Sequence, residues 1–111
     1  MQETLYEFAN IGYKRTGLDN IYIYAYSQAD KEVQHGPRIK VSNIYNKFSS
    51  SDNFTIDVIN KRVVNGVVKI TSKELEDVML WIGLNKDEII TYWKSKGEMD
   101  TDEFLNSLSK I

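Results

Sequence analysis

The sequence contains no cysteine and a single histidine, His35, among its 111 residues. Without cysteine the chain has no disulfide, no thiolate ligand for zinc and no thiol nucleophile. A single histidine also excludes a metal site built from several histidines of one chain. An all-carboxylate metal site stays possible at this point. We expect neither a metal ion nor a cofactor.

Long apolar segments are also lacking, and no run approaches the ~20 residues that a membrane-spanning helix needs. Residues 1–10 carry acids and no basic residue, unlike a secretory signal. We therefore expect a cytoplasmic protein with no membrane partner. At 41% hydrophobic and 12% aromatic residues, the composition is that of a folded chain, and the length predicts a single domain over residues 1–111.

Strong charge of one sign is absent too, because the formal net charge is only −2. Residues 1–70 hold nine Lys/Arg and seven Asp/Glu, whereas residues 71–111 hold five and nine. This small acidic protein therefore does not coat nucleic acid by charge alone.

Strand patterns fill the middle of the chain. Ile21–Tyr26 alternates apolar and tyrosine residues, which predicts a strand. Arg38–Tyr45 and Phe54–Val58 alternate in the same way. Asn60-Lys61 and Asn65-Gly66 are turn signals, the second typical of a type I′ hairpin turn. Residues 67–70 either add a short strand or lead into the helices.

After residue 70 the apolar period changes from 2 to 3.6, which indicates helices. Thr71 and Glu74 form a capping box, and Gly83 is predicted to end the helix that they begin. Two further capping pairs predict two further helix starts: Asn85 with Glu88, and Asp100 with Glu103. Both tryptophans, Trp81 and Trp93, are predicted to lie in the core.

Together these patterns predict an α+β fold. We expect a small antiparallel sheet of three to four strands within about residues 20–70. Two to three helices within about residues 71–109 follow and pack on one face of the sheet. The pattern leaves open whether residues 1–18 belong to the sheet.

Three segments carry a family resemblance. Gly36-Pro37-Arg38-Ile39-Lys40-Val41 follows the first strand, Phe54–Val58 lies in the hairpin position, and Leu80–Trp93 forms the helical end. Over about residues 20–96 the chain resembles the small bacterial family called domain of unknown function 4160. In that family a Pro-Pro-His-Phe-His-Val stretch follows the first strand.

In this chain Arg38 and Lys40 replace both motif histidines, and Gly36 replaces the first proline. Chemistry that depends on two alternating histidines is therefore lost. The resemblance implies the α+β fold and a gene neighbourhood like that of toxin–antitoxin pairs.

Tyr22, Tyr24 and Tyr26 project to one face of the first predicted strand. Arg38 and Lys40 share one face of the next strand. If the two strands pair, the cations flank the rings. Three interpretations stay open: the rings only cover the sheet, they contact a protein, or they stack bases while the cations hold phosphates.

His35 is a weak candidate for a general base, with Arg38 as its electrophilic partner. Because no second acid–base group accompanies it, the sequence favours a protein without catalytic activity. The acids of residues 71–111 fall mainly in first helical turns, where they stabilise helix N-termini. Residues 100–103 superficially resemble a calcium loop but lack the glycine and a terminal glutamate at EF-hand spacing, so we predict no metal site there.

We predict a non-enzymatic interaction protein that binds another protein, as an antitoxin-like, immunity or phage-type inhibitor component does. Its predicted contact residues are Tyr22, Tyr24, Tyr26, Arg38 and Lys40. The alternative is a toxin-like ribonuclease or RNA-binding module that uses the same sheet face. A regulatory subunit that acts with a neighbouring gene product, and a homodimer, also stay open.

Overall fold

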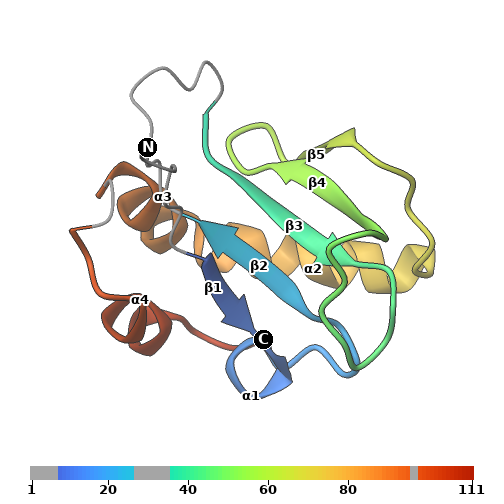
Figure 1. Ribbon diagram of the computed structural model, residues 1–111, viewed down its shortest axis with the longest axis horizontal. Coiled ribbons are helices and arrows are strands. Elements are labelled where there is room, and N and C mark those ends of the chain that lie inside the picture. Colours follow the sequence, from blue (N-terminus) through green and yellow to red (C-terminus); the bar gives the residue numbers. More distant parts are fainter. Residues whose placement is uncertain (1–7, 27–35, 96–97) are drawn as a thin grey trace, which may run out of the picture.

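Five antiparallel strands form one sheet, and helices cover one of its faces (Figure 1). The computed structural model describes residues 8–26, 36–95 and 98–111. The elements follow the chain as β1 (Phe8–Ile11), α1 (Tyr13–Thr16), β2 (Ile23–Tyr26), β3 (Arg38–Ser42), β4 (Asn53–Asp57), β5 (Arg62–Asn65), α2 (Ser72–Leu84), α3 (Lys86–Lys94) and α4 (Thr101–Ser107). No helix of these described ranges has the length and apolar character needed to span a membrane.

The sheet is a meander in which each strand pairs with its neighbours along the chain, in the order β1-β2-β3-β4-β5. The predicted α+β class, with helices after the strands, is confirmed. The sheet has five strands rather than three to four, because β1 lies ahead of the predicted range. β1 pairs with β2 from Phe8 opposite Tyr26 to Ile11 opposite Ile23. Ala9 and Ile11 are both fully buried, which explains why this short segment joins the sheet.

One core lies between the sheet and the helices. Alternate residues of each strand point into it because the side-chain period of a strand is two. Its strand residues are Ala9, Ile11, Ile23, Ala25, Ile39, Val41, Phe54 and Ile56, and its helix residues include Val78, Trp81, Ile82, Ile89, Tyr92 and Phe104. The opposite face of the sheet is therefore the one that carries the polar residues.

α2 begins at the predicted capping box. The hydroxyl of Thr71 accepts a hydrogen bond from the Glu74 amide, and the Glu74 carboxylate accepts one from the Thr71 amide at 2.8 Å. The predicted end at Gly83 was wrong, because α2 continues to Leu84 and α3 begins at Lys86. Asn85 therefore stands between two consecutive helices.

The other two predicted capping interactions are not made. Asn85 and Asp100 occupy the N-cap positions of α3 and α4, but neither side chain caps its helix. Asn85 is buried, and its amide pairs instead with the backbone of Ser109 beyond α4. Asn85 therefore binds the distant Ser109 backbone instead of capping α3.

The hairpin turn between β4 and β5 occupies residues 58–61, where Lys61 has a φ of 54°. Asn65-Gly66 ends β5 and makes no hairpin, and residues 67–70 lead into α2 without a further strand. Gly66 has a φ of 85°, and a Cβ there would lie 2.7 Å from the Asn53 carbonyl oxygen. The close approach of β4 and the left-handed conformation both require glycine at this position.

The two tryptophans differ in burial. Trp81 is fully buried, as predicted, but Trp93 is only partly buried. Its predicted place in the core is taken by Tyr92, which stacks on Phe104 at a centroid distance of 4.1 Å. Ile89, three residues earlier on α3, is buried in the same core.

Glu74 links the start of α2 to the loop after β3. Its carboxylate accepts hydrogen bonds from the Thr71 amide and, at 2.7 Å, from the Tyr45 hydroxyl. These two hydrogen bonds, the backbone one first, hold the pKa of Glu74 below its ordinary value. The hydrogen bond to Glu74 also raises the pKa of Tyr45.

We expect the stabilisation by Glu74 to depend on pH. Because its pKa is lower in the folded chain, the ionised carboxylate stabilises the fold above the unfolded pKa of about 4.3. This contribution is lost as the pH falls through the lower folded pKa. Urea unfolding should therefore show Glu74→Gln less stable than wild type at pH ~7 and the difference reduced at pH ~3. A difference independent of pH would contradict this assignment.

Candidate binding site

A row of aligned side chains crosses the outer face of the sheet, which the helices leave uncovered. Asn10 lies opposite Tyr24, Tyr24 opposite Lys40, Lys40 opposite Thr55, and Thr55 opposite Asn65. Side chains directly opposite one another on one face are close neighbours. The register therefore places an amide, a phenol and an ammonium group side by side on β1, β2 and β3.

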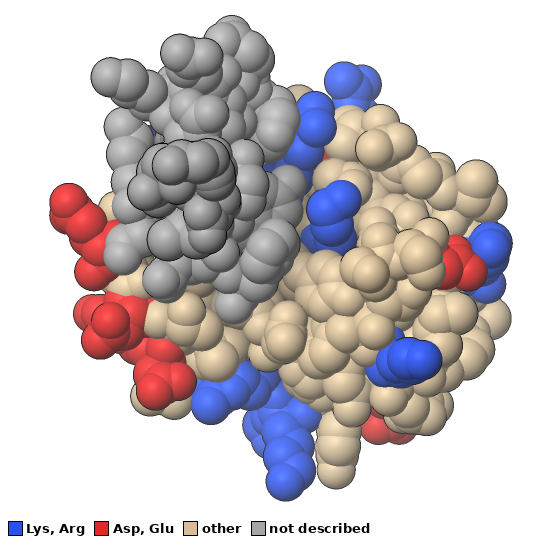
Figure 2. All heavy atoms as spheres, viewed as in Figure 1, with Lys and Arg blue, Asp and Glu red and all other residues tan. Residues whose placement is uncertain are grey.

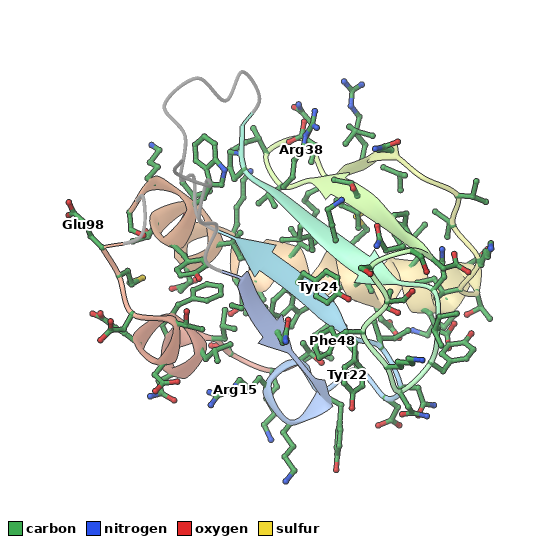
Figure 3. The ribbon with its side chains drawn as sticks, in the orientation of Figure 1. Arg15, Tyr22, Tyr24, Arg38, Phe48 and Glu98 are labelled. Atoms are coloured by element: carbon green, nitrogen blue, oxygen red, sulfur yellow. The ribbon has the colours of Figure 1, made fainter. Side chains whose placement is uncertain are left out.

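The loop of residues 43–52 brings a further aromatic ring to this row (Figure 3). Phe48 stacks on Tyr24 with a centroid distance of 5.0 Å and an interplanar angle of 23°. It also meets Tyr22 edge to face at 4.5 Å. The tyrosine row predicted from the sequence is therefore partly covered by the protein's own phenylalanine.

This loop is anchored at its base by Asn43. The Asn43 amide nitrogen donates to Asp52 at 3.0 Å and to the Val67 carbonyl oxygen at 2.8 Å, and its oxygen accepts from the Lys69 amide. The Lys69 ammonium also lies 3.0 Å from the Asp52 carboxylate, and this hydrogen bond lowers the pKa of Asp52. These contacts fix the two ends of the loop that carries Phe48.

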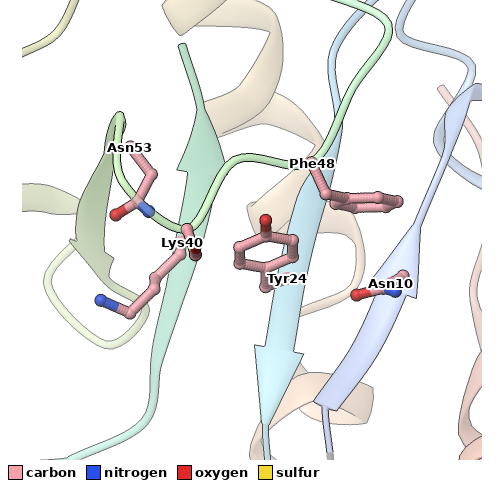
Figure 4. Close-up of a pocket in the computed structure, with 6 residues that line it drawn as sticks. Asn10, Tyr24, Lys40, Phe48 and Asn53 are labelled. Carbon is pink, nitrogen blue, oxygen red and sulfur yellow. The ribbon is translucent and has the colours of Figure 1, made fainter. Parts of the chain in front are cut away.

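The loop and the sheet together form an open pocket of about 400 Å³ (Figure 4). It is lined by Asn10, Tyr24, Lys40, Phe48, Ser50 and Asn53. The two rings form apolar walls, while the ammonium and amide groups stand at the sides. Partial burial raises the pKa of Tyr24 above its ordinary value. The pocket thus suits a flat apolar group with a polar or negatively charged neighbour.

Arg38 and Lys40 place two cations on the same side of β3, two residues apart. Neither forms an ion pair within the part of the chain that the structure describes. Asp57 lies opposite Arg38 in the register, but its carboxylate accepts hydrogen bonds from the Ile59 amide at 3.0 Å and the Asn60 side chain at 2.9 Å. Within the described residues, both cations are therefore available to an external anion.

Figure 2 views this face and shows how the charges are distributed. Lys and Arg side chains lie over the sheet, whereas a group of Asp and Glu lies at the left edge, toward α4. Asp100, Asp102 and Glu103 belong to the cap and first turn of α4. These three acids lie at the start of α4 and do not line the pocket.

Four of the predicted contact residues lie on this face: Tyr22, Tyr24, Arg38 and Lys40. Tyr24 and Lys40 line the pocket, and Tyr22 borders a second, smaller pocket of about 230 Å³ next to α1. The backbone of Tyr26 pairs with Phe8 in the sheet, but its side chain is not described. His35 lies outside the described residues.

Sequence reasoning missed Asn10, Phe48, Ser50 and Asn53, which complete the pocket. Phe48 offered one signal, because a phenylalanine beside a serine-rich loop requires a packing partner. The others are polar residues of β1, the loop and β4, and only the sheet register brings them together. In the described ranges no three Asp, Glu, His or Cys residues gather to hold a metal ion.

No protein-family model, curated protein or solved structure matches this chain. The resemblance to domain of unknown function 4160 therefore stays a prediction.

Proposed function

We propose that this chain is a non-enzymatic interaction protein that binds another protein through the outer face of its sheet. In this role it is an antitoxin-like, immunity or phage-type inhibitor component. The observation that carries the proposal is the pocket lined by Tyr24, Phe48 and Lys40, with Arg38 two residues from Lys40 on β3 and neither cation in an ion pair within the described residues. Aromatic residues and arginine are favoured anchors of protein interfaces. The resemblance to a family with toxin–antitoxin-like gene neighbours supports a protein partner.

The packing of the aromatic rings favours a protein over a nucleic acid. A surface that binds single-stranded RNA presents open ring faces on which bases stack. Here Phe48 already occupies one face of Tyr24 and contacts Tyr22. The rings therefore act more readily as the walls of a pocket than as a row of stacking platforms.

An RNA-binding or toxin-like ribonuclease function is the second candidate. The partly exposed Phe48 ring lies in the same pocket as Lys40, and this combination favours a base with its phosphate. Stacking of one base on an aromatic ring contributes about 1–3 kcal/mol. Salt separates the two candidates, because each phosphate contact to a single strand adds about −0.7 to the slope of log affinity against log salt.

The test compares tagged wild type with the Arg38→Ala/Lys40→Ala double variant in a bacterial host. We expect wild type to form a stoichiometric, nuclease-resistant protein complex and the double variant to bind at least ~10-fold more weakly. Because exposed strand cations contribute little to folding, the free energy of unfolding should change by less than about 0.5 kcal/mol. Growth and bulk RNA integrity are followed in the same cultures.

A matched control removes two lysines from the helices instead, as Lys73→Ala/Lys94→Ala, and should bind like wild type. Equal binding by all three proteins would contradict a binding site on this sheet face. Growth arrest with RNA cleavage, relieved by the Arg38→Ala/Lys40→Ala variant, would establish the second candidate in its place.

A further inference from the structure

We infer that the pocket is an anchor site for one aromatic side chain of the protein partner, carried by an extended segment with a carboxylate two residues away. This inference rests on the proposed function and specifies the chemistry of the partner. It predicts a segment with the pattern acidic–any–aromatic, or the reverse, lying across β3.

The walls of the pocket select a ring. Tyr24 and Phe48 stack on each other at 5.0 Å, and Lys40 lies beside Tyr24 on the side away from Phe48 (Figure 4). A partner ring that lies against the exposed edges of this aromatic pair contacts aromatic carbon, and the neighbouring ammonium can lie over its face in a cation–π contact. A volume of about 400 Å³ accommodates one large side chain with space for water.

The side-chain amides of Asn10 and Asn53 favour a partner ring that carries a polar group. Asn10 and Asn53 flank the pocket from β1 and β4. The Asn53 amide nitrogen already donates to the Ser49 carbonyl oxygen at 2.7 Å, so its side-chain oxygen is left as an acceptor. A tyrosine hydroxyl is one group that donates to such an acceptor. Tyrosine is therefore the anchor that best matches these groups.

The spacing of Arg38 and Lys40 favours an acidic residue in the partner segment, two residues from its aromatic residue. Arg38 and Lys40 lie two residues apart on one face of β3, about 6.4–6.8 Å along the strand. Side chains two residues apart in an extended partner segment also share one face and have the same spacing. When the partner's ring lies beside Lys40, a carboxylate two residues away is placed near Arg38. Both cations lack ion-pair partners in the described ranges, so binding breaks no ion pair of either residue.

The first experiment is an NMR titration of isotope-labelled protein with three capped peptides at low salt. The probes are Ser-Glu-Ser-Tyr-Ser, Ser-Lys-Ser-Tyr-Ser with the charge reversed, and Ser-Glu-Ser-Ala-Ser without the ring. We expect the first to shift the backbone signals of Asn10, Tyr24, Lys40 and Phe48, and the other two to bind at least ~10-fold more weakly. Equal binding of all three peptides, or no localised shift, would overturn the inference. Shifts produced by hexauridylate but not by the peptides would also overturn it, and would favour the RNA-binding function.

The second experiment separates the anchor site from the sheet face as a whole. Asn10→Trp fills the pocket from β1 and leaves Arg38 and Lys40 in place, and tryptophan is well accepted in strands. Asn65→Trp is the matched control, because it places the same ring on the same face at β5, outside the pocket. We expect Asn10→Trp to abolish the complex with the cellular partner and Asn65→Trp to retain it.

If Asn10→Trp binds the partner like wild type while Arg38→Ala/Lys40→Ala does not, the anchor inference fails and the proposed function stands. If neither variant changes binding, both fail. Ser50→Trp fills the same pocket from the loop, and it replaces Asn10→Trp if thermal unfolding shows that the strand variant does not fold.

Discussion

Replacing Trp81 with alanine is expected to lower the free energy of unfolding by about 3–5 kcal/mol. Trp81 lies on α2 and is fully buried in the core. Alanine leaves a cavity that the surrounding side chains fill only partly, so the loss of dispersion contacts adds to the loss of apolar burial. Because a domain has a total stability of about 5–15 kcal/mol, this single change removes a large part of it. Urea unfolding followed by circular dichroism measures the difference.

Two comparisons make this prediction specific. Trp93 is only partly buried, so Trp93→Ala should cost about 1–2 kcal/mol, within the ordinary range for single substitutions. Trp81→Phe should cost less than Trp81→Ala, because it leaves a smaller cavity and removes an indole N–H that has no hydrogen-bond partner in the described structure. A larger cost for Trp93→Ala than for Trp81→Ala would contradict the observed packing of the two helices.

The second large effect is expected at Asn85, where alanine should cost about 2–4 kcal/mol. The amide nitrogen donates to the Trp81 carbonyl oxygen at 3.1 Å and to the Ser109 carbonyl oxygen at 2.9 Å. The side-chain oxygen accepts from the Ser109 amide at 2.7 Å. Alanine leaves these backbone groups without their partner in a partly buried setting. Unfolding measurements give the total cost, and hydrogen exchange should show loss of protection at Ser109.

Asn85→Asp provides the sharper variant. It keeps an oxygen for the Ser109 amide but replaces the donor with a second oxygen facing two carbonyl groups, so it should be at least as destabilising as alanine. Asn106→Ala is the control, because this asparagine on α4 is exposed and accepts a surface hydrogen bond from Arg15. Its stability should change by less than about 0.5 kcal/mol. An Asn85→Ala variant as stable as this control would contradict the role of the buried amide.

Features with local causes could be predicted from the sequence. The alternation of Ile21–Tyr26 reports which side chains face the core, because the period of a strand does not depend on its partners. The capping box of Thr71 and Glu74 uses atoms only three residues apart, so its residues alone define the start of α2. The α+β class follows from the order of such local signals.

Features that depend on distant parts of the chain could not be predicted from the sequence. β1 is only four residues long, and its pairing with β2 is stabilised by burial that the pattern does not show. Asn85 and Glu88 have the spacing of a capping box, yet α2 runs directly into α3 and the amide binds Ser109 instead. The same spacing therefore gives a capping box at Thr71 and Glu74 but none at Asn85 and Glu88, because Asn85 binds Ser109 instead.

The candidate site also combines features that the sequence predicts with features that depend on distant contacts. Tyr24 and Lys40 could be assigned to one face because each lies in an alternating segment. Their direct pairing depends on register, which short strand patterns do not specify. Phe48 reaches Tyr24 only because Asn43 and its partners hold the loop that carries it. The pocket is thus a product of the sheet register and one long connection.

The meander also has a consequence for folding kinetics. Because neighbouring strands follow one another along the chain, each pairing closes only a short loop, at a small cost in chain entropy. The β4–β5 hairpin has the shortest connection, and such hairpins form within about 1–10 μs. In contrast, β1 and α4 are in contact although they lie near opposite ends of the described chain. We expect the chain to fold from its middle outward, hairpin by hairpin, with the contact between β1 and α4 formed last.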